Sequence, residues 1–476
     1  MSNLTWKVFV TGNWHSSDYP AARRMLCGKS DRSEVAAGIV VVLFLILATC
    51  CCGRHQGQSK TLLDEIGDIK IIDNHAHVVA MKAGDGTPDK EFDVFLVDEM
   101  EAGPLPVRLR PDNPEYKDAW RFFYGYKQED MTQQHVEELI GHKRQLMAAK
   151  GDAYPTWVLD HLGIETMLAN RVVMGRGLTA PRFRWVPFVD AFMFPLRNEK
   201  LRSEDPDSEV FYKAEERLLR RYLNLVNGGT LPPALAQYVE LVVKPLLRRQ
   251  KSEGAVAVKF EAAYLRTLNF ARADPRSAAR IYARYSRAST DEPPAAEYKL
   301  LQDYIFETIA QQAGELELPV HIHASGGFGN YFRLGRVDPT RLDAILSSPT
   351  LRKVTFVLLH GGWPYTKEIG FLLGKPNVYA DFSALTFLLY PDELAKILRR
   401  WLEYMPERIL FGTDAGPLLP QINWEESAWM SVTTGRRALA IALEGMVADR
   451  EISEDRAVEL ARLVMRENAR HLYKLP

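Results

Sequence analysis

The feature that most constrains the fold is a series of short apolar runs, rich in β-branched residues, that alternates with charged, helix-forming segments from residue 69 onward. Eight such runs lie at 69–78, 166–173, 184–194, 255–261, 319–324, 353–360, 377–382 and 408–413. Runs of this kind between helical segments are typical of repeated βα units, whose strands pair in parallel. Eight units predict an α/β fold in which the strands close into a (β/α)8 barrel, also called a TIM barrel, surrounded by helices.

Two stretches are longer than such a barrel needs. Residues 79–156 follow the first strand and combine a Pro/Gly-rich loop around Gly103 with an aromatic, helical stretch that includes Trp120. A long insertion after a strand lies at the catalytic end of a barrel, so we expect it to act as a cap. Packing against the outside of the barrel is the alternative interpretation. Residues 197–252 are rich in charge and helix formers, and we expect outer helices there.

Residues 1–58 are interpreted as a targeting segment and linker that precede the barrel domain at 59–476. No charged residue occurs between Glu34 and Arg54, and 36–48 is a continuous apolar run. Because a membrane-spanning helix needs about 20 apolar residues, the run suits a signal peptide or a short anchor. The segment Leu47-Ala-Thr-Cys50 resembles a lipoprotein cleavage site, although Thr49 departs from the usual small residue. We expect membrane association, as a bacterial lipoprotein or through an uncleaved anchor, with the barrel outside the cytoplasm.

Composition excludes several other classes of protein. The 60 Lys and Arg residues nearly balance 61 Asp and Glu residues, for a formal net charge of -1. This balance gives no general attraction to phosphate backbones, so we expect no nucleic-acid partner. The four cysteines all precede residue 53, so the predicted barrel can hold neither a disulfide framework nor a thiolate metal site.

A pair of histidines ends the first predicted strand, in the segment Asp73-Asn-His75-Ala-His77. Side chains alternate along a strand, so Asp73, His75 and His77 share one face, which in a barrel is the interior. Two imidazoles at this spacing can hold one divalent ion, and histidine is the commonest nitrogen ligand of zinc. The pair alone is a weak signal, and the other strand ends decide its meaning.

Three further strand ends carry groups of the same kind. His321 and His323 end the fifth strand, and we assign His323, nearer the mouth, as a ligand and His321 as a deeper residue. His360 ends the sixth strand and Asp414 ends the eighth, while Asp381 on the seventh is expected to support the site. Catalytic groups of barrels come from the C-terminal ends of several strands, so these positions together predict a metal centre.

The same segments resemble the amidohydrolase superfamily of metal-dependent hydrolases, from about residue 69 to the end of the chain. The likeness extends to the branch called amidohydrolase-related, with its His-Gly-Gly-x-Pro run at 360–364, its P-N-V-Y-x-D-x-S strand at 376–383 and its I-L-F-G-T-D strand at 409–414. The resemblance implies that His75, His77 and His323 bind the metal. It also implies that Asp414 is a ligand and proton shuttle, and that His360 polarises or orients the substrate.

The chemistry of these groups agrees with that implication. A divalent ion held by imidazoles and a carboxylate can lower the pKa of a bound water from about 15.7 toward about 7. Asp414 can accept the proton and deliver it to a leaving group, and His360 can hydrogen-bond an oxygen that gains charge. We therefore expect one or two divalent ions as the cofactor, with zinc as the expected metal.

Two basic residues near the fourth strand have open roles. The resemblance allows Lys259 to be a carbamylated bridge between two metal ions, or an unmodified amine that binds an anionic group of the substrate. A salt bridge with Glu261, which shares its face of the strand, is the third possibility. We expect Lys259 to act in the active site in one of the first two ways. Arg266 is a candidate for binding a substrate carboxylate through its fork of donors, and a surface arginine is the alternative.

The expected function is hydrolysis of a C–N or ester-like bond in a small molecule. The alternative that the resemblance implies is a metal-dependent decarboxylase. Its substrate would be a small carboxylic acid, which could be aromatic. A catalytically inactive barrel that binds ligands at the membrane is a third hypothesis. The intact set of histidines and aspartate at the strand ends favours an enzyme over this last hypothesis.

Overall fold

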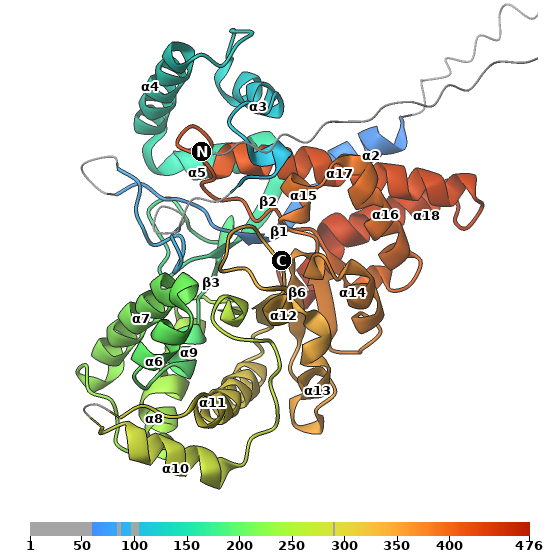
Figure 1. Ribbon diagram of the computed structural model, residues 1–476. Coiled ribbons are helices and arrows are strands. Elements are labelled where there is room, and N and C mark those ends of the chain that lie inside the picture. Colours follow the sequence, from blue (N-terminus) through green and yellow to red (C-terminus); the bar gives the residue numbers. More distant parts are fainter. Residues whose placement is uncertain (1–59, 83–86, 97–103, 289–290) are drawn as a thin grey trace, which may run out of the picture. The chain divides into compact units, whose positions relative to one another are not determined.

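The computed structural model describes residues 60–82, 87–96, 104–288 and 291–476 (Figure 1). Lys60 to Pro476 form one compact unit. The predicted targeting segment at 1–58, with its apolar run and Cys50, lies outside the described residues. In the part of the chain that the structure describes, no helix is long and apolar enough to cross a bilayer.

Eight parallel strands form the centre of this unit. They are β1 Ile71–Ala76, β2 Ile164–Asn170, β3 Phe183–Val186, β4 Val258–Phe260, β5 Val320–His323, β6 Phe356–Leu359, β7 Val378–Asp381 and β8 Ile409–Leu410. Each falls within or beside one of the eight predicted runs. One ladder joins β1 to β3 and a second joins β4 to β8.

Isolated parallel bridges connect the two ladders into a ring. Trp185 pairs with Ala255 and Phe188 pairs with Lys259 at the seam between β3 and β4. At the other seam Ala76, the last residue of β1, pairs with Ala415, just after β8. The predicted α/β fold with parallel strands is thus confirmed, and the strands close in sequence order around one axis, which is the arrangement of a barrel.

A small core fills the inside of the ring. It is built from inward side chains such as Ile72, Leu168, Val357 and Leu410, and the C-terminal segment adds Tyr473. All of these side chains are almost fully buried. This apolar plug leaves the C-terminal ends of the strands as the part of the barrel where polar groups gather.

Helices cover the outside of the ring. Apart from those in the two long insertions and α10, they are α2 Leu62–Asp68, α5 Tyr154–Leu162, α11 Ala295–Glu315, α12 Leu334–Val337, α13 Asp343–Leu346, α14 Thr366–Leu372, α15 Leu385–Leu388, α16 Pro391–Leu402, α17 Trp424–Ala448, α18 Glu454–Arg462 and α19 Asn468–Leu472. The helix α16 shows the pattern that fixes them, because Leu394, Leu398 and Trp401 recur on one face and are buried. A capping box between Asn423 and Glu426 begins α17.

The predicted outer helices at 197–252 are present between β3 and β4. They are α6 Glu199–Glu204, α7 Glu209–Asn227, α8 Leu235–Tyr238 and α9 Lys244–Ser252, and α10 Pro275–Tyr285 joins them after β4. Figure 1 shows this group in green and yellow as a lobe on one side of the strands.

The insertion after β1 has two parts. Its helices α3 Glu115–Tyr124 and α4 Gln133–Lys150 lie away from the strands (Figure 1). The aromatic face of α3 packs against α17, where the Phe122 and Trp429 rings are 6.3 Å apart and the Tyr124 hydroxyl donates to Glu425. The preceding stretch around Phe92 and Leu109 turns instead toward the mouth of the barrel.

Candidate active site

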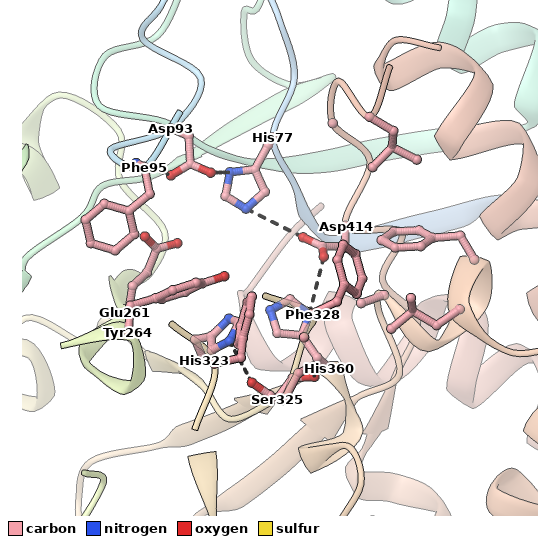
Figure 2. Close-up of a pocket in the computed structure, with 18 of the residues that line it drawn as sticks. His77, Asp93, Phe95, Glu261, Tyr264, His323, Ser325, Phe328, His360 and Asp414 are labelled. Carbon is pink, nitrogen blue, oxygen red and sulfur yellow. Dashed lines mark hydrogen bonds and ion pairs between the residues drawn. The ribbon is translucent and has the colours of Figure 1, made fainter. Parts of the chain in front are cut away.

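A cavity of about 230 Å³ lies at the C-terminal ends of the strands (Figure 2). His77, His323, His360, Asp414 and Lys259, which were predicted as site residues from five separate strands, all line it. The barrel brings them together because each ends, or nearly ends, its strand at the same rim.

Three lone-pair atoms converge on one side of this cavity. The Nε2 atom of His75 is 3.1 Å from Oδ1 of Asp414, and Nε2 of His77 is 3.5 Å from the same oxygen. The two Nε2 atoms are 3.3 Å apart. Imidazole nitrogens and a carboxylate oxygen in this arrangement are a suitable donor set for a divalent ion, so the residues fit the metal that the sequence predicts.

The electrostatics of His77 also favour a cation here. Burial opposes protonation of its ring, but Asp93 and Asp414 on either side outweigh burial and raise the pKa of His77 to about 9. Asp93 Oδ2 lies 3.1 Å from Nδ1 of His77, on the opposite side of the ring from Asp414 (Figure 2). A carboxylate that accepts the Nδ1 proton fixes Nε2 as the metal-binding nitrogen. Sequence reasoning missed Asp93, because it lies in the insertion where no strand periodicity marks it.

Asp414 is held in a form that can exchange a proton near neutral pH. Burial raises the pKa of its carboxyl to about 7, against the opposing charges of His77 and Lys259. Its backbone has φ of 55°, and that of His360 has φ of 61°, a left-handed conformation unusual for residues other than glycine. Strained backbone of this kind concentrates at functional sites, where the surrounding structure imposes it.

Asp73 shares the first strand with the histidines but serves a different purpose. Its carboxylate accepts hydrogen bonds from the backbone N–H and the hydroxyl of Thr413, at 2.9 and 2.6 Å. It also accepts from the N–H of His75. Asp73 therefore fixes the distance between the ends of β1 and β8, and with it the approach of His75 to Asp414.

Lys259 lies fully buried among these groups. Its Nζ atom is 3.4 Å from Oε1 of Glu261, 3.3 Å from Oδ1 of Asn170 and 3.5 Å from Nε2 of His75. The salt bridge with Glu261 that was the third possibility is thus present, and it coexists with a place in the cavity wall. Its carbamylation stays a prediction.

His323 and His321 occupy different depths, as the strand alternation predicts. His323 lines the cavity, and its Nε2 atom lies 3.1 Å from the carbonyl oxygen of Ser325. The His323 and His360 rings are 4.7 Å apart, although His323 does not join the close group of His75, His77 and Asp414. His321 lies below, with Nε2 2.8 Å from the Tyr473 hydroxyl. The role of His323 as a metal ligand therefore stays a prediction.

The ring of His360 is held by a second buried network. Its Nδ1 atom is 2.9 Å from the hydroxyl of Ser383, and that hydroxyl donates to Asp381 at 2.7 Å. Asp381 also accepts from Asn74 and from the backbone N–H of His360. Asp381 thus supports the site from β7 as expected, and Ser383 was missed because an isolated serine carries no distinguishing pattern.

Arg266 is the predicted site residue that the structure does not bring to the cavity. Its guanidinium donates to Asp303 at 2.6 Å and to Gln302 at 3.0 Å, and it lies 4.4 Å from the centre of the Phe270 ring. The partners come from α11, which packs outside the barrel. Its position seven residues beyond Lys259 did not reveal that the chain turns away from the mouth there.

The sequence model of a family described as amidohydrolase matches residues 225–475, which is more than half of the chain. The chain belongs to the amidohydrolase family. The matched residues include β4 to β8 with Lys259, His323, His360 and Asp414, and the barrel adds His75 and His77 from the first strand.

Individual relatives of this amidohydrolase are distant. The protein fluG of Emericella nidulans is 29% identical over 203 residues, which are 41% of this chain and 22% of that protein. The chain thus corresponds to less than a quarter of that relative's length.

Two solved structures share the fold over 87% of this chain. A uronate isomerase from Thermotoga maritima matches over 96% of its own chain, with a TM-score of 0.55 and 13% identity. A protein from Lactobacillus casei classed as a metal-dependent hydrolase matches over 98% of its chain, with a TM-score of 0.52 and 16% identity. At such identities the likeness concerns the fold alone.

Proposed function

We propose that this amidohydrolase is a metal-dependent hydrolase that cleaves a C–N or ester-like bond in a small molecule. The observation that carries the proposal is the convergence of His75 Nε2, His77 Nε2 and Asp414 Oδ1 within hydrogen-bonding distance of one another at the mouth of the barrel. A divalent ion bound there supplies Lewis acidity and a water acidic enough to ionise near neutral pH.

The protein's own residues supply the remaining steps. Asp414 is the general base that takes a proton from the attacking water, and it returns the proton to the leaving nitrogen or oxygen. Its buried carboxyl suits this exchange, because a pKa near the working pH favours both directions of transfer. The resemblance to the family supports a role for His360 beside the reacting carbonyl group, and the presence of Lys259 in the lining of the cavity supports a contact with the substrate or the ion.

Two other reactions compete with hydrolysis. Decarboxylation needs a place for the carboxylate of the substrate, and the isomerase from Thermotoga maritima shows that the same fold accommodates a further reaction. Arg266, the cation that would favour an acidic substrate, is engaged by Asp303 outside the cavity. This observation favours hydrolysis over decarboxylation.

The proposal is tested first by measuring the metal content of the protein and then by screening for substrates. The full-length protein is purified without added metal, and bound ions per chain are measured by elemental analysis, with zinc as the expected ion. One ion per chain is expected at the group of His75, His77 and Asp414, whereas two ions would point to a carbamylated Lys259 or to a second ion at the group of His77, Asp93 and Glu261. A protein that binds no ion after incubation with zinc would overturn the proposal. Amide and ester libraries are then screened for metal-dependent cleavage.

We further propose that residues 1–58 direct the protein to a membrane, in a bacterial lipoprotein or by an uncleaved anchor. The support is the uncharged stretch between Glu34 and Arg54 and the cysteine at position 50. Replacing Cys50 with serine should release the protein from the membrane fraction if this cysteine is lipidated. Retention of the Cys50→Ser variant in that fraction would instead favour the uncleaved anchor, and a soluble wild-type protein would contradict both.

A further inference from the structure

One wall of the cavity is a continuous aromatic surface. It consists of Phe95, Tyr264, Tyr331 and Phe332, and we call it the aromatic wall. The Tyr264 ring lies 5.3 Å from that of Phe95 and 5.1 Å from that of Phe332, and the Tyr331 and Phe332 rings are 5.0 Å apart. Tyr264 is also 4.6 Å from the ring of His323, so the aromatic wall begins at the polar end of the cavity.

Aliphatic side chains line other parts of the same cavity. Leu105 and Leu109 come from the insertion after β1, Leu388 ends α15, and Leu418 follows β8. Three separate segments thus present branched apolar groups to the space that also contains the aromatic wall. A bound molecule that contacts these side chains would transfer its apolar surface out of water, which favours its binding.

The charges around the cavity oppose an anionic group in this apolar part. Among the described residues that line it, Lys259 is the one lysine or arginine, and its Nζ atom is already 3.4 Å from Glu261. The acidic lining residues are Asp93, Glu261 and Asp414. A carboxylate at the remote end of a substrate would be buried beside these acids, and the lysine of the lining is already paired with Glu261, which is unfavourable.

Glu261 offers a specific contact to a neutral molecule. Its side chain is 5% exposed, its Oε1 atom faces Lys259, and its Oε2 atom has no hydrogen-bond partner. Figure 2 shows the carboxylate between Asp93 and Tyr264, directed into the cavity. A buried acceptor of this kind is best satisfied by an N–H or O–H group of the ligand.

We infer that the site selects a neutral substrate with an aromatic or branched apolar group, which lies on the aromatic wall and donates a hydrogen bond to Glu261. The inference rests on the proposed hydrolase function for the position of the reacting bond. It excludes substrates whose far end is a carboxylate or a polyhydroxylated chain, such as uronates.

The test compares three primary amides that differ in the group attached to the amide carbon. Phenylacetamide, its 4-carboxy derivative and gluconamide carry an aromatic, an anionic and a polyhydroxylated remote end. Their dissociation constants are measured on the zinc-loaded full-length protein by ligand-observed NMR. Phenylacetamide is expected to bind about tenfold or more tightly than either of the others, because they bury a charge or unpaired hydroxyls. Equal or tighter binding of either, or no binding of phenylacetamide, would overturn the inference.

A charge placed on the aromatic wall should reverse part of this preference. Phe332 is only half-buried, so Phe332→Arg can be accommodated, and it should tighten binding of the 4-carboxy derivative by about tenfold. The matched control is Phe371→Arg on α14, since Phe371 is 76% exposed and does not line the cavity. The control should bind the three amides as the wild type does.

Binding and turnover separate this inference from the proposed function. Selective binding of phenylacetamide without metal-dependent cleavage of any amide or ester would leave the substrate preference standing and count against the hydrolase. Metal-dependent cleavage of substrates with anionic remote ends in preference to neutral ones would support the hydrolase and contradict the inferred substrate preference. If Phe332→Arg fails to fold, the comparison of the three amides on the wild-type protein still decides.

Discussion

The hydroxyl oxygen of Ser383 lies 2.9 Å from Nδ1 of His360. Because this hydroxyl donates its own proton to Asp381, it can only accept from His360, which places the imidazole proton on Nδ1. Burial lowers the pKa of His360 well below its ordinary value, so the ring is neutral. Nδ1 also lies 3.7 Å from Oδ2 of Asp414, and with the proton on Nδ1 the Nε2 atom of His360 carries a lone pair, which suits an acceptor or a ligand better than a donor.

Replacing Ser383 with alanine removes the group that sets this tautomer. We expect the value of kcat/KM for the substrate found in the screen to fall about 10- to 100-fold, because the imidazole can then rotate or carry its proton on Nε2. The melting temperature should change little, and Ser203→Ala, on the exposed helix α6, should leave both quantities unchanged. An unaltered kcat/KM in Ser383→Ala would show that the tautomer of His360 is immaterial.

Replacing Asp414 with asparagine should abolish most of the turnover without unfolding the protein. Asparagine tolerates the left-handed backbone found at this position, so the loop after β8 is preserved. The loss of the general base should lower kcat by about 10²- to 10⁴-fold. The exposed Asp392→Asn is the control, and circular dichroism checks the fold. Undiminished activity would end the assignment of Asp414 as the proton shuttle.

Much of this site could be predicted from the sequence, because the apolar pattern of each strand shows where the strand ends. Periodicity located all eight strands, and the positions of His77, His323, His360 and Asp414 at strand ends placed them in one cavity. Only the C-terminal rim of a parallel barrel brings such distant positions together, so the prediction needed no knowledge of individual contacts.

Residues outside the strands could not be found in this way. Asp93 reaches His77 from an irregular loop, whose path depends on packing against the rest of the barrel. Arg266 was misplaced for the same reason, since the turn after β4 carries it toward Asp303 on α11. Neither the apolar pattern nor the spacing along the chain encodes where an irregular segment turns.

Replacing Lys259 tests both its salt bridge with Glu261 and its role in metal binding. Lys259→Ala leaves Glu261 buried without its cationic partner, so we expect a loss of about 3 to 5 kcal/mol in the free energy of unfolding. The double variant Lys259→Ala, Glu261→Gln should recover most of this loss, which chemical denaturation measures. Metal content is measured in the same samples. Half the wild-type content would indicate a carbamylated bridge between two ions, whereas unchanged content with weaker substrate binding would indicate an unmodified amine.

Arg266→Ala distinguishes a structural from a substrate-binding arginine. Loss of the charged hydrogen bonds to Asp303 should destabilise the protein by about 2 kcal/mol, because Lys299 remains as a partner of that carboxylate. The value of KM should not change. The exposed Arg462→Ala is the control for stability. A large rise in KM with unchanged stability would restore the predicted contact with a substrate carboxylate.

The stability of the metal-free protein should fall as the pH rises from about 6.5 to 9. His77 dominates this range, because its pKa is raised from 6.5 to about 9, whereas Asp414, whose pKa is raised from 3.8 to about 7, contributes mainly below pH 7. Both groups bind more protons in the folded protein than in the unfolded chain, so unfolding becomes easier as they lose protons. Histidines with lowered pKa values, such as His360, act only below about pH 6.5 and do not contribute here.

Saturation with zinc should oppose this trend. An ion bound by His75, His77 and Asp414 requires their deprotonated forms, so its affinity and its stabilising effect increase with pH over the same range. Melting temperatures recorded from pH 6.5 to 9, with zinc and with a chelator, should therefore diverge as the pH rises. In the His77→Asn variant, which lacks both a ligand and the ring held by Asp93, the two curves should stay together. Parallel curves for the wild-type protein would show that zinc binds elsewhere than at this group of ligands.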